Sequence, residues 1–147
     1  MDRRAFIKSG CMVCLIATVS GNLIPSCTPL AIINGKMNKD GLIVDASEFI
    51  FTKNKKQQFR SSIILRNETL QYPICIFRIN ENEYNAVWMR CSHQGTELKI
   101  SGQHLYCSAH GSEFAHNGKV INGPAAKDLQ TFPVTINKNE LFIDLRK

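Results

Sequence analysis

Two short segments, each combining a cysteine with a histidine, constrain this chain more than any other feature. Residues 91–95 read CSHQG and residues 107–112 read CSAHGS. Each segment contains glycine, which is typical of a tight turn, and each supplies one thiol and one imidazole. A chain that folds around these two segments must bring four metal-binding side chains to one place.

The order of the ligands within the segments distinguishes two kinds of metal site. Two cysteines with two histidines can bind structural zinc, or a binuclear iron–sulfur cluster in which histidines replace two cysteines on one iron. Zinc sites favour a cysteine pair and a separate histidine pair, whereas each segment here is mixed. In a binuclear cluster each loop must give one ligand to each iron, and mixed segments meet that requirement. The pattern favours such a cluster on Cys91, His93, Cys107 and His110, with mononuclear zinc as the alternative.

The segment between the two motifs predicts a hairpin. Residues 98–100 and 104–106 are rich in residues that favour strands, and they flank a Ser101-Gly102 turn. This hairpin would place the two motifs side by side.

The rest of the body also reads as short strands separated by turns. The strand-like runs are residues 42–44, 62–65, 74–79, 86–89, 132–136 and 141–145. Only residues 45–49 suggest a single turn of helix, and no stretch keeps a helical period. The sequence therefore predicts an all-β fold in one domain, over residues 39–147.

Other residues that could carry chemistry are expected to be structural. Cys75 lies in the apolar run 73–77 and is expected to be a small buried hydrophobe. His104 and His116 have no partner motif and are expected at the surface. Aromatic side chains are expected to pack in the core, namely Phe51, Phe59, Trp88 and Tyr106.

Composition excludes two further classes. The three body cysteines, Cys75, Cys91 and Cys107, cannot all pair with one another, so a disulfide framework is a poor interpretation. The net charge of +6 is modest and scattered. Its one lysine cluster, over residues 53–56, is explained by a solvated turn, so nucleic acid is not an expected partner.

Residues 1–26 are predicted to be an export signal. Arg3 and Arg4, followed by Phe6, Ile7 and Lys8, resemble the bacterial twin-arginine signal. The apolar stretch over residues 9–24 is diluted by polar residues and is short against the roughly 20 apolar residues that a membrane-spanning helix needs. Residues 27–38 are expected to form a tether.

The end of this signal resembles a lipoprotein processing site. Residues 24–27 read IPSC, and cleavage before Cys27 would leave it as a lipidated N-terminus. An uncleaved signal anchor and simple cleavage remain as alternatives. Each of the three places the domain outside the cytoplasm, in the periplasm or on the outer face of the cytoplasmic membrane.

Residues 40–145 resemble the Rieske [2Fe–2S] family, most strongly over residues 91–126. The resemblance implies one cluster per chain, held by the Cys-x-His-x-Gly and Cys-x-x-His-Gly-Ser loops. By that likeness Cys91 and Cys107 bind the buried iron, and His93 and His110 bind the iron near the surface. The implied Rieske fold consists of antiparallel sheets forming a sandwich with an inserted cluster-binding subdomain. Gly123 and Pro124 belong to a segment that looks like the third loop, which covers the cluster.

Departures from the family pattern predict an intermediate reduction potential. High-potential members carry a disulfide whose cysteines would occupy positions 96 and 109, but this chain has Thr96 and Ala109. The serine that donates to a cluster sulfur is present as Ser112. The tyrosine that donates to a ligand thiolate is replaced by Phe114. One donor of the usual pair is kept.

The resemblance implies an electron-transfer component, such as the iron–sulfur subunit of a quinol–cytochrome c reductase. Such a protein relays electrons between quinol or an oxidoreductase and a c-type cytochrome, with cytochrome b or cytochrome c as partner. The alternative is a small subunit of a periplasmic oxidase whose catalytic cofactor is on another chain, the oxidase large subunit. No catalytic residue of its own is expected. The twin-arginine signal agrees with the cluster, because that route exports folded proteins and iron–sulfur clusters are assembled in the cytoplasm.

Overall fold

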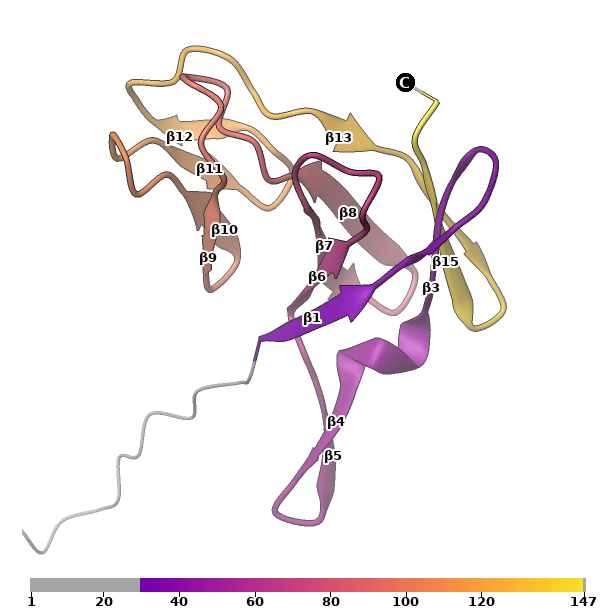
Figure 1. Ribbon diagram of the computed structural model, residues 1–147. Helices are drawn as coiled ribbons and strands as arrows, with labels where there is room; N and C mark the ends of the chain where they lie inside the picture. Colours follow the sequence, from indigo (N-terminus) through magenta and orange to yellow (C-terminus); the bar gives the residue numbers. More distant parts are fainter. Residues whose placement is uncertain (1–29, 147) are drawn as a thin grey trace, which may run out of the picture.

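The computed structural model describes residues 30–146, which form β-strands and one short 3₁₀ helix, η1, over Ala46–Phe49 (Figure 1). The predicted signal over residues 1–26, with Arg3 and Arg4, lies outside the described residues, as does Cys27. In the part of the chain that the structure describes, no helix is long and apolar enough to cross a membrane.

The central sheet has the strand order β1-β6-β7-β8-β13. Its strands are β1 (Ala31–Asn34), β6 (Ser62–Arg66), β7 (Ile74–Asn80), β8 (Glu83–Trp88) and β13 (Thr131–Phe132). Strands β6, β7, β8 and β13 pair antiparallel, whereas β1 pairs parallel with β6.

A second sheet packs on one side of the central sheet, and a third sheet stands on the other side (Figure 1). The second sheet has the order β14-β15-β3-β2 and consists of β2 (Lys36–Met37), β3 (Gly41–Asp45), β14 (Val134–Asn137) and β15 (Glu140–Asp144). The third sheet has the order β12-β11-β10-β9 and consists of β9 (Lys99–Ser101), β10 (His104–Tyr106), β11 (Glu113–Ala115) and β12 (Val120–Asn122).

Alternation along the central strands explains how one sheet serves both neighbours. In a strand successive side chains point to opposite faces. Ile74 and Ile76 of β7 accordingly join a core cluster with Leu42 and Ile143 of the second sheet. The intervening Cys75 and its neighbour Phe77 join a different cluster, which includes Leu105 and Phe114 of the third sheet. The central sheet is therefore buried on both faces, and each face has its own core.

The fold class was predicted correctly as all-β, with antiparallel sheets and a separate small sheet inserted between β8 and β13. The predicted helical turn is also present, and Asp45 caps it by accepting a hydrogen bond from the Ser47 N–H at 2.7 Å. The parallel pairing of β1 with β6 was not expected.

The tether expected over residues 27–38 is wrong for residues 31–37, because they form β1 and β2. Ile32 and Ile33 pair with Ile64 and Leu65 of β6. Beyond β1, the Gly35 N–H donates to the Arg66 carbonyl oxygen at 3.2 Å. The run Ala31-Ile32-Ile33 favours a strand. It was not predicted as one because a glycine and several polar residues follow it.

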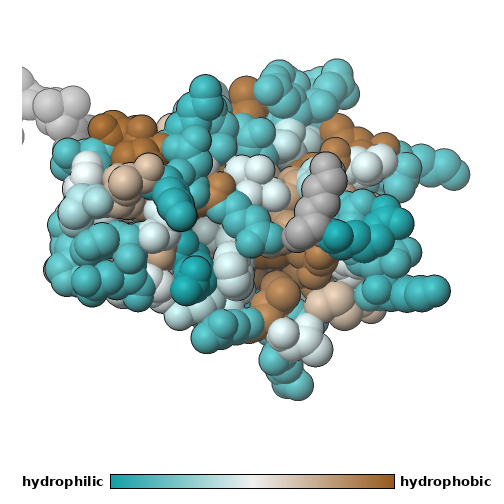
Figure 2. All heavy atoms as spheres, turned by 90° about the horizontal axis from the view of Figure 1, so that it is seen from above, coloured by the Kyte–Doolittle hydropathy of each residue, from teal (hydrophilic) through white to brown (hydrophobic). Residues whose placement is uncertain are grey.

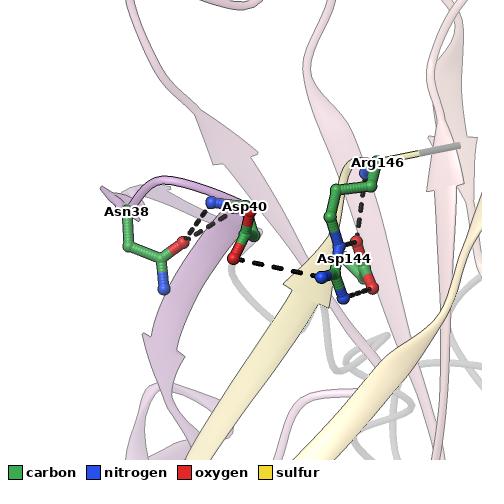
Figure 3. Close-up of polar contacts among 5 residues, drawn as sticks. Asn38, Asp40, Asp144 and Arg146 are labelled. Atoms are coloured by element: carbon green, nitrogen blue, oxygen red, sulfur yellow. Dashed lines mark hydrogen bonds and ion pairs between the residues drawn. The ribbon is translucent and has the colours of Figure 1, made fainter.

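Polar contacts join the two ends of the domain (Figure 3). The Asn38 side-chain oxygen accepts hydrogen bonds from the Asp40 and Gly41 N–H groups, both at 2.9 Å, and shapes the turn before β3. Arg146 pairs with Asp144 at 2.5 Å and reaches Asp40 at 4.0 Å. These exposed charges orient the C-terminal strand against the β2–β3 turn, although exposed ion pairs stabilise by only about 0–1 kcal/mol each.

A separate hairpin, β4 (Ile50–Lys53) with β5 (Lys56–Phe59), projects from the body (Figure 1). The expectation that Phe59 packs in the core is wrong, because half of its surface is exposed and the Arg78 guanidinium covers its ring at 4.4 Å. Phe51 is half-buried.

The face seen in Figure 2 is mostly hydrophilic, and hydrophobic residues reach it at separate places.

Candidate metal centre

Two loops carry the four candidate ligands. One leads into the third sheet, and the other connects its two central strands. Loop 1, residues 89–98, connects β8 to β9 and contains Cys91 and His93. Loop 2, residues 107–112, connects β10 to β11 and contains Cys107 and His110. The hairpin predicted between them is present, since Leu105 of β10 faces Ile100 of β9.

Loop 1 closes through two backbone hydrogen bonds around its cysteine. The Gly95 N–H donates to the Cys91 carbonyl oxygen at 2.8 Å, and the Cys91 N–H donates to the Thr96 carbonyl oxygen at 2.9 Å. Gly95 has a φ of +75°, a conformation that glycine adopts without steric cost.

Loop 2 repeats this backbone frame. The Gly111 N–H donates to the Cys107 carbonyl oxygen at 2.9 Å, and the Cys107 N–H donates to the Ser112 carbonyl oxygen at 2.8 Å. Gly111 has a φ of +80°. Both loops therefore hold a cysteine in the same local structure, with a glycine four residues later.

The thiols and the imidazoles lie in different environments. Cys91 and Cys107 are each about 1% exposed and belong to the core beneath the loops. His93 and His110 are exposed, with ring centroids 5.0 Å apart and ring planes at 90°. The two thiols are thus buried, and the two imidazoles lie next to each other at the surface.

The buried thiols of Cys75 and Cys107 differ in the direction in which their pKa is shifted. Burial raises the pKa of Cys75 well above its usual value. Burial also acts to raise the pKa of Cys107, but hydrogen bonds from the Ala109 and His110 N–H groups, and from the Cys91 and Thr96 side chains, lower it overall. Backbone N–H groups that converge on a sulfur stabilise its thiolate, which is the form that binds metal.

A third loop, after β12, forms hydrogen bonds with both ligand loops. The Ala125 N–H donates to Ser112 Oγ at 3.0 Å, and Ser112 is fully buried. In loop 1, Ser92 Oγ donates to the Lys127 carbonyl oxygen at 2.5 Å. This loop contains Gly123 and Pro124, as expected for a segment that covers a cluster; Ser92 was not singled out from the sequence.

The donor set fits a cluster of two irons. Within residues 30–146, no group of three or more His, Cys, Asp or Glu side chains lies close enough together to hold a metal ion. A cluster with two cysteines and two histidines needs two ligands on each of two irons. Thiols on one side and imidazoles on the other supply that arrangement.

Comparison with known proteins decides the family. The sequence profile of the Rieske [2Fe-2S] domain matches residues 51–133, more than half of the chain. This chain belongs to the Rieske family. It is a Rieske [2Fe–2S] electron-transfer protein related to the iron–sulfur subunits of cytochrome b6-f complexes, and its cofactor is a Rieske [2Fe–2S] cluster.

Two curated relatives are the cytochrome b6-f complex iron-sulfur subunits of Synechococcus sp. strains JA-2-3B'a(2-13) and JA-3-3Ab. Each is 42% identical over 55 residues, covering 36% of this chain and 30% of the relative. The chain thus matches less than a third of the length of these relatives. Among solved structures, the plasma membrane Rieske protein PetC3 from Synechocystis PCC 6803 is similar with 28% identity and a TM-score of 0.50, covering 57% of this chain and 86% of that one.

Residues around this Rieske centre show where it departs from the high-potential pattern. Phe114 is fully buried among the core residues beneath the loops. The described cysteines, Cys75, Cys91 and Cys107, are all free thiols, so no disulfide joins the ligand loops in the described part of the chain. Cys75 is fully buried, which confirms its expected role as a small hydrophobe.

His104 and His116 lie outside the two Rieske loops. Both were expected at the surface, but neither is fully exposed. Both are half-buried. His116 packs its ring against Phe77 and its Nδ1 shares a 2.9 Å hydrogen bond with Asn85 Nδ2. Asn85 and Phe77, on the central sheet, account for the partial burial of His116, and neither residue lies in the sequence motifs.

Proposed function

We propose that Cys91, His93, Cys107 and His110 bind the Rieske cluster and that the His93–His110 surface exchanges electrons with partner proteins. The observation that carries this proposal is the repeated loop frame, which buries both thiols and brings the two imidazoles to 5.0 Å at the surface. When bound, a Rieske cluster takes up and releases a single electron.

The protein's own residues give this cluster its surroundings. Water is excluded from the cysteine side of the cluster, because both cysteines are buried in a core that includes Leu105 and Phe114. The exposed imidazoles leave the other side open to a partner. Ser112 accepts the Ala125 N–H through its oxygen, so its own hydroxyl hydrogen is available to donate to a cluster sulfur.

We further propose that the domain works on the outer side of a bacterial cytoplasmic membrane. The paired Arg3 and Arg4 support export by the twin-arginine route, which carries folded cargo. The motif before Cys27 supports lipid anchoring at that residue, with an uncleaved signal anchor as the alternative. In the described part of the chain, the first strand, β1, begins at Ala31.

We propose that electrons pass between quinol or an oxidoreductase and a c-type cytochrome. The similarity to subunits named for the cytochrome b6-f complex and to a plasma membrane Rieske protein supports this assignment. The alternative, the small Rieske subunit of a periplasmic oxidase with its catalytic cofactor on another chain, has the same cluster and the same exposed imidazoles.

Isolation of the protein with its partners from membranes tests the assignment. The tagged full-length chain is purified from the native cell envelope in mild detergent, and the co-purifying proteins are identified by mass spectrometry and haem staining. We expect a cytochrome b or a haem c protein. A large molybdenum-type subunit in their place would support the oxidase alternative, and recovery from the cytoplasm alone would contradict the proposed location.

A further inference from the structure

The residue before the first ligand, Arg90, holds its guanidinium on an aromatic platform. The group lies 5.7 Å from the ring centroid of Trp88 and 6.0 Å from that of Tyr72. The two rings pack edge to face at 5.7 Å, and Trp88 Nε1 donates to the Tyr72 carbonyl oxygen at 3.3 Å. Cation–π contact with two rings that are fixed to each other restrains the guanidinium.

The same guanidinium lies against the turn of loop 1. A methyl group placed on Gly95 would lie 3.3 Å from Arg90 Nη2 and 3.4 Å from its Nε. Gly95 is the residue whose N–H closes the loop onto the Cys91 carbonyl oxygen. The positive charge of Arg90 is therefore held beside the backbone that carries Cys91 and His93.

The carboxylate directly across the bridge from Arg90 does not neutralise this charge. Glu97 faces Arg90 across an antiparallel bridge, but its carboxylate forms an ion pair with Arg66 at 2.5 Å. Within residues 30–146, no carboxylate forms an ion pair with Arg90. Arg90 thus keeps an uncompensated charge at the edge of the metal centre.

We propose that Arg90 raises the reduction potential of the cluster, with Trp88 and Tyr72 as the positioning residues that hold its charge in place. This inference rests on the proposed ligand assignment. On reduction the cluster gains one electron from its donor, with no bond made or broken, so its charge becomes more negative by one unit. A fixed positive charge nearby stabilises that reduced state relative to the oxidised state. Because Arg90 is exposed, dissolved ions screen the effect.

The test compares Arg90→Gln with the unmodified full chain, both carrying the cluster, by protein-film voltammetry at low and at high salt. We expect the potential of Arg90→Gln to shift downward at low salt, and the difference to shrink at high salt. Arg90→Lys keeps the charge and should restore most of the potential, even though lysine packs on aromatic rings differently.

Arg78→Gln is the matched control, because it also removes a guanidinium from an aromatic ring. Arg78 lies over Phe59 at 4.4 Å and pairs with Tyr84, toward the end of the β7–β8 hairpin that is remote from loop 1. Its substitution should leave the potential unchanged. An equal downward shift in both variants, or a shift in Arg90→Gln that is insensitive to salt or not restored by lysine, would overturn the proposal.

Electron paramagnetic resonance (EPR) spectra separate this proposal from the ligand assignment on which it rests. If Arg90→Gln shows the Rieske signal of the unmodified protein and the same potential, the role of Arg90 is wrong and the ligand assignment stands. If the unmodified protein shows no Rieske signal after reduction, the ligand assignment itself fails.

Discussion

The two faces of the central sheet achieve burial in different ways. The base face, formed by Ile63, Leu65, Ile74 and Ile76, packs against the second sheet in a core of aliphatic and aromatic side chains that contains no thiol. The ligand face includes Cys75, Phe77, Val87 and Met89, and it packs against a sheet that also contributes the buried thiol of Cys107.

The two partner sheets also differ in the length of their longest strand pairing. In the second sheet β3 and β15 pair over five residues, from Gly41 with Asp144 to Asp45 with Glu140. In the third sheet every strand is three residues long. Short strands make few ladder hydrogen bonds, so we infer that the third sheet depends on the metal centre for its stability. Metal-binding free energy then contributes directly to folding on the ligand face and not on the base face.

Removal of one ligand should break the ligand face alone. We expect Cys107→Ser to abolish the visible absorption and the bound iron and sulfide, and to expose the amides of β9–β12 to rapid hydrogen exchange. The amides of β6 and β7 should stay protected. Absorption spectroscopy and hydrogen-exchange mass spectrometry measure both effects.

Cys75→Ala is the control for that experiment, because Cys75 lies on the same face and is equally buried. It should keep the cluster. Retention of a full complement of iron by Cys107→Ser, or loss of iron from Cys75→Ala, would contradict the assignment.

A cavity on the base face should destabilise the domain without touching the cluster. Ile76 is fully buried in the core between the central and second sheets. We expect Ile76→Ala to lower the free energy of unfolding by about 2–5 kcal/mol, the usual cost of removing this much buried side chain. Urea denaturation measures the loss, and Ile79→Ala, on the partly exposed end of the same strand, should cost less. An altered EPR spectrum in folded Ile76→Ala would show that the two faces are not separate.

The Ser112 hydroxyl should matter to both stability and redox chemistry. Ser112→Ala leaves the Ala125 N–H without its acceptor, which should cost about 1–3 kcal/mol of unfolding free energy. Loss of a hydrogen-bond donor to the cluster should also lower the reduction potential. Ser92→Ala, which removes the corresponding contact from loop 1 to the third loop, should leave the potential closer to that of the unmodified protein. A potential in Ser112→Ala equal to or above the original would refute the donor role.

The missing hydroxyl at position 114 provides the opposite test. Phe114 is fully buried beneath the loops. We expect Phe114→Tyr to raise the potential if the new hydroxyl reaches a ligand thiolate, and the unmodified protein to lie below about +250 mV near pH 7, within the range of about −150 to +300 mV for such centres. Protein-film voltammetry measures both values. A potential in Phe114→Tyr that falls or stays constant would count against the hydrogen-bond argument.

The smallest effect concerns the thiols of iron-free protein. Because the pKa of Cys107 is lowered and that of Cys75 is raised, Cys107 has the larger thiolate fraction near pH 7. Iodoacetamide should therefore modify Cys107 before Cys75, as followed by peptide mass spectrometry. Raising the pH toward the usual thiol pKa should narrow the difference in rate. Equal rates near pH 7 would indicate that the hydrogen bonds around Cys107 do not persist without iron.

The features that the sequence predicted correctly are those encoded locally. The hairpin at Ser101-Gly102 and the strand at residues 74–79 follow from short-range patterns. The pairing of β1 with β6 joins residues 31–34 to residues 63–66, and such distant pairings leave no local signal. The β11 and β12 strands, of three residues each, were not predicted.

At the site, the ligand candidates followed from residue type and spacing, whereas their surroundings did not. Arg90 reads as an ordinary polar residue until the structure places it over Trp88 and beside Gly95. Ser92 and Lys127 likewise come together only through the fold. Contacts between loops depend on how the sheets pack, and no single segment of the sequence determines that packing.

We propose that two loops of the same frame each give one sulfur and one nitrogen ligand to a pair of irons. Pulsed EPR of the reduced protein labelled with ¹⁵N-histidine tests it directly. We expect a spectrum with a low average g value and strong coupling to two histidine nitrogens. The cluster should be lost in His93→Ala and His110→Ala and retained in His104→Ala and His116→Ala. A reduced centre without histidine coupling, or coupling that persists in His93→Ala and His110→Ala, would contradict it.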